Sequence, residues 1–150
     1  MSNDQSPIIL AFSGGLDTSF CVPWLKETYG RDVITATVDT GGIDADAALQ
    51  LEERSKALGA IEHVLIDCKQ DFFDDVIRHL LAGNVLRGQA YPQCVGAERG
   101  LQAERLAQLA RDRQAPTVAQ GCTAARNDQV RFEVALRTHN PGLETRAPVR

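Results

Sequence analysis

The sequence lacks three features, and each absence argues against a class of protein. It has no apolar run of the roughly 20 residues that a membrane-spanning helix needs, so we expect no membrane partner. Its first six residues are polar and include no basic segment, which argues against a signal peptide. The 20 aspartates and glutamates outnumber the 16 lysines and arginines, and the net charge of −4 argues against a nucleic-acid partner.

Cysteines are few and far apart. No two of the four stand in a Cys-x-x-Cys pair, so their spacing favours neither a zinc site nor a disulfide framework. We therefore expect no metal held by protein side chains, and a reduced, cytoplasmic setting is the default. The four are Cys21, Cys68, Cys94 and Cys122.

Apolar segments of strand length alternate with segments of helical periodicity along the 150 residues. A chain of this length forms one domain that buries roughly 70% of its unfolded surface. Strands are expected at about 7–12, 33–38, 63–67, 117–121 and 144–147. Helices are expected at about 17–29, 45–58, 71–81, 101–113 and 128–136. This alternation predicts a three-layer α/β fold: a mostly parallel five-stranded sheet with helices on both faces, Rossmann-like in class.

Residues 82–100 interrupt the pattern, because their periodicity is lost among glycines and a proline. The sequence predicts a long loop there, either functional or loosely ordered. In parallel sheets, ligands collect at the carboxyl ends of the strands. That rule nominates residues 13–19, 39–42 and 121–128 as ligand-binding segments.

The segment 13–19 reads Ser-Gly-Gly-Leu-Asp-Thr-Ser and joins the first expected strand to the first expected helix. Gly14 and Gly15 permit a tight turn whose amides approach a ligand, at the positive end of a helix. A Walker loop would need a lysine and a Rossmann fingerprint would need Gly-x-Gly-x-x-Gly, and neither is present. A glycine turn with a capped helix and no ligand is the simpler alternative. The clustered hydroxyls after an apolar strand favour a phosphate site instead.

The segment 121–133 is the second informative stretch. It leaves a strand through small residues and enters a helix that Asn127 or Asp128 is placed to cap. A cap with solvent-facing Arg131 and Glu133 is the simpler alternative. The density of hydrogen-bonding groups at a predicted sheet edge favours a ligand-binding role.

Together, Ala11–Ser19, Gly121–Thr123 and Asn127–Glu133 resemble argininosuccinate synthase, a family of the N-type ATP pyrophosphatases. The resemblance spans nearly the whole chain. It implies an adenine nucleotide alpha hydrolase-like fold and a cytoplasmic ligase of arginine biosynthesis. In the implied reaction, ATP with Mg²⁺ activates the ureido oxygen of citrulline as an adenylate and diphosphate is released. The amine of aspartate then displaces AMP, which gives argininosuccinate.

The resemblance also implies site residues, position by position. ATP is assigned to Ala11, Phe12, Ser13, Gly14, Gly15, Leu16, Asp17, Thr18, Ser19, Val38 and Gly121. Citrulline is assigned to Tyr91, Asn127 and Arg131, since an arginine fork suits its carboxylate. Aspartate is assigned to Thr123, Asn127 and Asp128. No catalytic side chain and no metal ligand follow from it.

The chain also departs from the family pattern. Arg126 stands where the family usually has a glycine, and Gly96 stands where a serine commonly contacts citrulline. We expect residues 1–150 to be the nucleotide-binding domain, without the second domain that completes the citrulline pocket and builds the family's homotetramer. Two alternatives stay open. One is a stand-alone ATP pyrophosphatase that adenylates another acceptor with a partner chain, and the other is a non-catalytic relic or regulatory partner.

Overall fold

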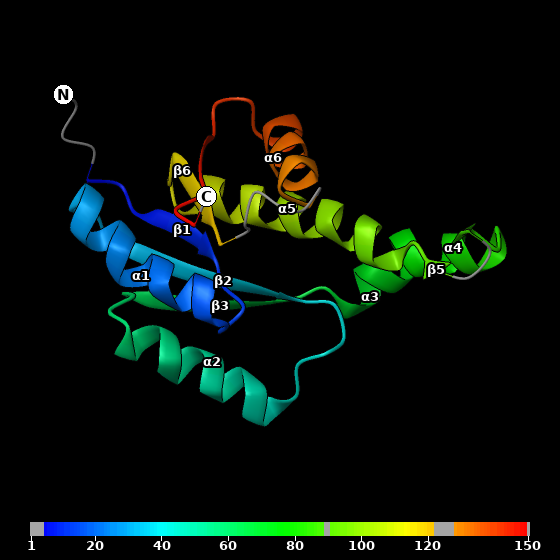
Figure 1. The fold of residues 1–150 in the computed structure, drawn as a ribbon, viewed down its shortest axis with the longest axis horizontal. Helices are drawn as coiled ribbons and strands as arrows, with labels where there is room; N and C mark the ends of the chain where they lie inside the picture. Colours follow the sequence, from blue (N-terminus) through cyan, green and yellow to red (C-terminus); the bar gives the residue numbers. More distant parts are fainter. Residues whose placement is uncertain (1–4, 89–90, 122–127, 150) are drawn as a thin grey trace.

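The protein contains one five-stranded sheet in the order β3-β2-β1-β6-β7, with every neighbouring pair parallel (Figure 1). The structure is a computed structural model that describes residues 5–88, 91–121 and 128–149. Within these ranges it describes only the backbone of Arg87, Tyr91, Pro92, Val95, Asp128 and Gln129. The strands, close to their predicted positions, are β1 (Ile8–Ala11), β2 (Val33–Asp39), β3 (Glu62–Asp67), β6 (Thr117–Gln120) and β7 (Glu144–Arg146).

Helices cover both faces of this sheet (Figure 1). Helices α1 (Leu16–Tyr29) and α2 (Ala45–Ala57) lie on one face, and α5 (Cys94–Asp112) and α6 (Asp128–His139) lie on the other. Alternation within β1 explains the two layers. Ile8 and Leu10 are buried in the cluster beneath α1, whereas Ile9 is buried in the cluster beneath α5 and α6. The predicted three-layer α/β fold is confirmed.

The chain changes direction across the sheet at β1. Strands β2 and β3 build outward on one side of β1, and β6 and β7 build outward on the other. Ile8 therefore pairs with Val33 of β2 and with Thr117 of β6. Connections that leave β1 and β6 toward opposite faces open a crevice at the carboxyl ends of these strands. This topological switch point positions the candidate site.

The segment after β3 differs from the prediction. In place of one helix, the chain forms α3 (Lys69–Phe72), the π-helical turn η1 (Phe73–Ile77) and α4 (Arg78–Ala82). A short antiparallel pair follows, β4 (Leu86–Arg87) with β5 (Tyr91–Pro92). The predicted loop 82–100 is wrong over its last part, because α5 already begins at Cys94. Glycines at 96 and 100 hide the helical periodicity there.

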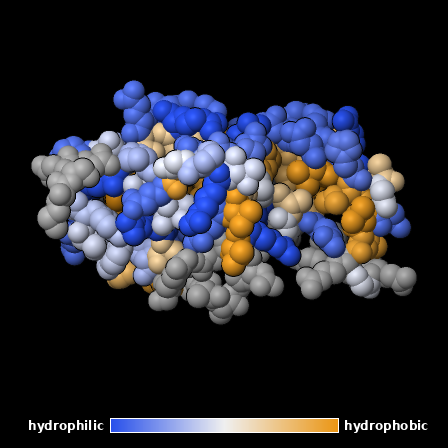
Figure 2. Space-filling model, turned by 90° about the horizontal axis from the view of Figure 1, so that it is seen from above, coloured by the Kyte–Doolittle hydropathy of each residue, from blue (hydrophilic) through white to orange (hydrophobic). Residues whose placement is uncertain are grey.

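The elements from α3 to β5 form an arm beside the amino-terminal end of α5, away from the sheet (Figure 1). Seen from above, apolar side chains are exposed toward this end of the molecule (Figure 2). Exposed large apolar residues of the arm are Phe73, Leu81, Val85 and Leu86. No helix among the described residues is long and apolar enough to cross a bilayer.

Candidate functional site

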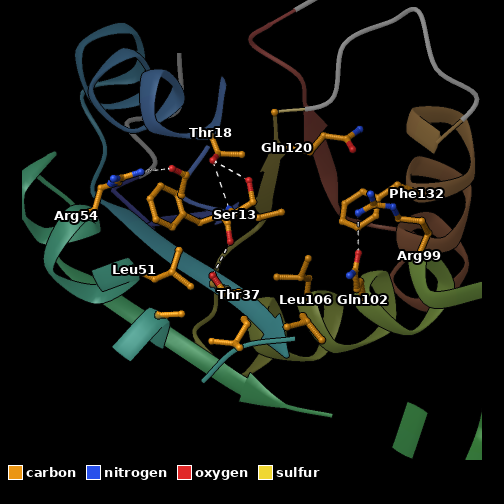
Figure 3. A pocket seen from close by; sticks show the side chains of 18 of the residues that line it. Ser13, Thr18, Thr37, Leu51, Arg54, Arg99, Gln102, Leu106, Gln120 and Phe132 are labelled. Atoms are coloured by element: carbon orange, nitrogen blue, oxygen red, sulfur yellow. Dashed lines mark hydrogen bonds between the residues drawn. The ribbon is translucent and has the colours of Figure 1, made fainter. Parts of the chain in front are cut away.

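The loop that follows β1 holds its own shape through hydrogen bonds. The Ser13 amide donates to Thr18 Oγ1 at 3.3 Å, and the hydroxyl oxygens of these two residues lie 3.2 Å apart (Figure 3). Thr18 Oγ1 also donates to the carbonyl oxygen of Gly15 at 3.3 Å. At the start of the loop, the Thr37 hydroxyl of β2 donates to the Phe12 carbonyl oxygen. The loop is therefore shaped before a ligand binds, which lowers the entropic cost of binding.

Two glycines let neighbouring elements press against this loop. Gly14 has a φ of +71°, and a Cβ there would lie 2.6 Å from Cδ2 of Leu51 in α2. A Cβ on Gly121, directly after β6, would lie 2.8 Å from Thr18 Cγ2 and 3.2 Å from the Thr18 amide nitrogen. A side chain at Gly121 would press on the backbone of the loop, whereas one at Gly14 would be strained by the positive φ and would displace the end of the Leu51 side chain. The loop is thus seated tightly between α2 and the end of β6.

Positive charge converges on the loop from two sources. Gly15 is the N-cap of α1 with extended backbone, and among the described residues no side chain caps this helix end. Its first-turn amides are left for an external acceptor, and the helix dipole adds partial positive charge. Arg54 of α2 contributes a full charge and donates from Nη1 to the Gly14 carbonyl oxygen. Loop, helix end and arginine together make an anion-binding arrangement.

A cavity of about 580 Å³ opens beside the loop, over the carboxyl ends of β1, β2 and β6 (Figure 3). This volume lies within the usual range of small-molecule sites. Its α2 side is lined by the apolar side chains of Val38, Ile43, Ala47 and Leu51. Its α5 and α6 side is lined by Arg99, Gln102, Leu106 and Phe132, with Gln120 from β6.

Arg99 is held by a chain of hydrogen bonds that begins outside the cavity. The Thr40 hydroxyl donates to Glu98 Oε1 at 2.6 Å, and the same oxygen accepts from Gln102 Nε2 at 2.9 Å. Gln102 Oε1 then accepts from Arg99 Nη1 at 2.9 Å. Because an ionised carboxylate only accepts, Glu98 decides which way the Gln102 amide points and leaves its oxygen to Arg99. The buried Nε of Arg99 has no hydrogen-bond partner among the described residues.

The charge around the cavity has one sign. Its charged lining residues are Arg54 and Arg99, and no carboxylate lines it in the part of the chain that the structure describes. In the same described ranges, no group of three or more His, Cys, Asp and Glu side chains could hold a metal ion. The cavity therefore favours an anionic ligand and disfavours a cationic one.

The turn after β2, predicted as a ligand segment, is occupied by its own aspartate. The Asp39 side chain is 2% exposed and accepts from the amides of Gly41 (2.8 Å) and Gly42 (3.3 Å) and from Lys69 Nζ (2.8 Å). Burial opposes ionisation of Asp39, but these hydrogen bonds outweigh it and lower the pKa of its carboxyl group below the usual value. The two glycine amides are therefore engaged within the turn.

Most of the residues predicted to bind ATP do line the cavity: Ala11, Phe12, Ser13, Gly14, Thr18, Val38 and Gly121. The others flank it. Gly15 is the N-cap of α1, Asp17 and Ser19 follow in the helix, and Leu16 is 88% exposed.

Among the residues predicted to bind citrulline or aspartate, only Arg131 has a described side chain. A Cβ on Gly96 would lie 2.9 Å from Arg131 Nη1, so this glycine gives the guanidinium room against α5. Tyr91 lies in β5 and Asp128 begins α6. The predictions for Thr123 and Asn127, and the departure at Arg126, fall outside the described residues.

The sequence reasoning missed polar residues of the cavity that come from elements far apart in the chain. Arg99 stood in a segment predicted to be a loop, and Arg54 and Gln102 look like ordinary helix-surface residues. Gln120 carried a usable signal, because it is a polar residue at the carboxyl end of a predicted strand, directly before a glycine.

The parallel sheet, the crevice at its switch point and the glycine loop after its first strand define a Rossmann-like, doubly wound α/β domain. A solved structure described as a predicted subunit of a tRNA methyltransferase from Methanocaldococcus jannaschii shares this fold, with a TM-score of 0.66. It is 19% identical in sequence, and the match covers 96% of this chain and 68% of that one.

The family model for the arginosuccinate synthase N-terminal HUP domain matches residues 7–150. The chain therefore belongs to the argininosuccinate synthase family, as its loop and its Asn-Asp-Gln-Val-Arg-Phe-Glu run indicated. Argininosuccinate synthase of Lactiplantibacillus plantarum is 42% identical over 151 residues and that of Sulfurisphaera tokodaii is 39% identical over 143. These matches cover 100% and 95% of this chain, which spans 36% of the length of either relative.

Proposed function

We propose that residues 1–150 are the nucleotide-binding domain of an argininosuccinate synthase-type ligase and bind ATP in the cavity beside the loop. The observation that carries this proposal is the anion-binding arrangement of Gly14, the uncapped end of α1 and Arg54, at the mouth of that cavity. Membership of the argininosuccinate synthase family supports ATP as the ligand.

In this proposal the loop holds the polyphosphate through the amides of residues 14 and 16–18 and the hydroxyls of Ser13 and Thr18, while the Ser13 and Ser19 amides keep their bonds within the loop and helix. Adenine lies on the α2 side, where Val38, Ile43 and Leu51 offer apolar walls. Two strand spacings, roughly 10 Å, separate the ends of β2 and β6. A base on the β2 side thus leaves the β6 side for a second substrate.

Mg²⁺ would be held chiefly by phosphate oxygens, because no carboxylate lines the cavity among the described residues. Asp17, in the first turn of α1, is the acidic residue of the loop and the protein group best placed to assist. The ion would supply charge neutralisation at the phosphates.

The acceptor is proposed to be citrulline, whose ureido oxygen attacks the α-phosphorus of ATP as diphosphate leaves. Aspartate then displaces AMP through its amine. Arg131, with Tyr91 and Asn127, is assigned to citrulline, and Thr123, Asn127 and Asp128 are assigned to aspartate. A cavity with two arginines suits an anionic nucleotide and a neutral ureide. The complete reaction, a second domain, a homotetramer and a cytoplasmic location are proposed from the full-length relatives.

Calorimetric titration with ATP, with and without Mg²⁺, tests the nucleotide site. Asp17→Ala is expected to lose the magnesium-dependent part of the affinity. Asp46→Ala is the matched control, since Asp46 occupies the same first-turn position of α2. No binding of ATP to the wild-type chain at millimolar concentration would end the proposal. Equal losses in both variants would remove Asp17 from it.

A further inference from the structure

Gln120 is the last residue of β6 and carries a buried side-chain amide. Its side chain is 2% exposed, and neither Nε2 nor Oε1 has a hydrogen-bond partner among the described residues. It lines the cavity and extends toward the side where Phe132 and Arg99 lie (Figure 3). A buried polar group that stays unpaired costs stability, so native proteins seldom keep one without a use.

A second unpaired group lies at the same end of the cavity but belongs to another element. Arg99 of α5 has one nitrogen fixed by Gln102, while its buried Nε has no partner in the described ranges. Leu106 and Phe132 supply apolar surface beside these groups. Strand β6 and helix α5 thus each bring a polar group with no partner among the described residues to the same end of the cavity. This convergence indicates a ligand subsite.

The chemistry of Gln120 restricts what this subsite accepts. A carboxamide offers one acceptor and one donor group in a plane, so its best partner presents a donor and an acceptor on one edge. Amides, ureides and the edge of adenine have this pattern. Ammonium and guanidinium groups offer donors only, and the positive charges of Arg54 and Arg99 oppose them.

The position of the subsite favours a second substrate over adenine. The apolar walls suited to a base are those of Val38, Ile43 and Leu51, on the α2 side. Gln120 lies across β1 from them, on β6. A nucleotide that places its base against α2 and its phosphates on the loop therefore leaves Gln120 free for the acceptor.

The geometry points to Gln120 as a specificity-determining residue that selects a neutral, planar ureide or amide acceptor. This inference rests on the proposed nucleotide site. The Gln120 oxygen accepts from an N–H of the acceptor, and its NH₂ group donates to the acceptor's carbonyl oxygen. The acceptor's carbonyl oxygen then keeps its second lone pair for another contact. The positive charge of Arg99 disfavours a cationic competitor.

The test uses the 150-residue chain loaded with α,β-methylene ATP, titrated with L-citrulline and, separately, with L-arginine. Gln120→Leu removes both the carbonyl oxygen and the NH₂ group of the side chain, and Gln120→Glu leaves acceptors only. Gln108→Leu is the control, because Gln108 lies on α5 at the surface and bonds Asp112. Loss of two hydrogen bonds is expected to weaken citrulline binding about ten- to a hundredfold in Gln120→Leu, with the affinity for the nucleotide unchanged. In Gln120→Glu the preference is expected to move toward arginine, which pairs with a carboxylate.

The melting temperature distinguishes a ligand-binding role of Gln120 from a purely structural one. Because the amide has no partner to lose among the described residues, Gln120→Leu is expected to melt at or above the wild-type temperature. Citrulline affinity that stays within twofold in a folded Gln120→Leu protein overturns the inference. A loss of nucleotide affinity instead assigns Gln120 to adenine and also overturns it. Failure of the wild type to bind nucleotide overturns the proposed function first, whereas failure confined to citrulline overturns this inference alone.

Discussion

The substitution Gly121→Ala tests how closely the loop after β1 (residues 13–19) is seated against β6. The new Cβ would lie 2.8 Å from Thr18 Cγ2 and 3.2 Å from the Thr18 amide nitrogen, whereas relaxed carbon contacts are about 3.5–4.0 Å. Thr18 must therefore move by roughly 0.7–1.2 Å or the strands must yield, at a cost of about 1–3 kcal/mol. In a domain of 150 residues this lowers the melting temperature by about 2–12 °C.

The same shift misaligns the loop for its ligand. If two loop amides lose good geometry toward a phosphate, the affinity for ATP with Mg²⁺ is expected to fall about tenfold or more. Calorimetric melting and titration measure the two effects on one sample. Gly42→Ala is the control, because a Cβ there has nothing within 4 Å and both properties should stay near wild type. Unchanged ATP affinity in Gly121→Ala would refute the close seating of the loop.

Three further predictions concern charge, pH and the acceptor side. Arg54→Met is expected to lower ATP affinity about tenfold at low salt, and the difference should shrink at high salt because the lost interaction is electrostatic; an equal difference in both titrations would contradict this. Burial lowers the pKa of His63 below its usual 6.5, so below that pH the unfolded chain binds more protons and stability falls as pH drops. His63→Gln should flatten this fall between about pH 7 and pH 5.5 in urea unfolding, and an undiminished slope would count against the prediction. In Gly96→Ala the added Cβ would lie 2.9 Å from Arg131 Nη1, so the guanidinium would have to shift. Citrulline affinity should drop with ATP affinity retained, and unchanged citrulline affinity would count against Arg131 as its partner.

The sheet was predictable because its strands are short, apolar and β-branched, and because alternation with helices imposes parallel pairing. The order of the strands was not predictable, because the sequence of a strand that is buried on both faces does not show which strands lie beside it. Helix α5 shows a second limit. Gly96 and Gly100 argue locally against a helix, yet its later turns bury Ala103, Leu106 and Ala107 in the core cluster with β1, β2 and β6. Tertiary packing here outweighs local propensity.

The loop after β1 could be read directly because residues 13–19 are contiguous in sequence, whereas Arg54 and Gly121 reach it from distant elements. The other half of the cavity could not, since Arg99 of α5 and Gln120 of β6 line the same cavity only in the folded chain. The hydrogen-bond chain from Thr40 to Arg99 likewise joins residues 59 positions apart, so no local sequence pattern reveals it. The assignments of Thr123 and Asn127 stay predictions.

Amide chemical shifts of the loop give the most direct test of nucleotide binding, and a 16.3 kDa chain suits the measurement. On titration with ATP and Mg²⁺, the amide resonances of Gly14 to Ser19 are expected to shift strongly. Adenosine, which lacks phosphates, should move resonances near Val38 and leave the loop unchanged. Loop amides that stay in place at millimolar ATP, while the chain remains folded, would contradict the claim that this loop binds the phosphates.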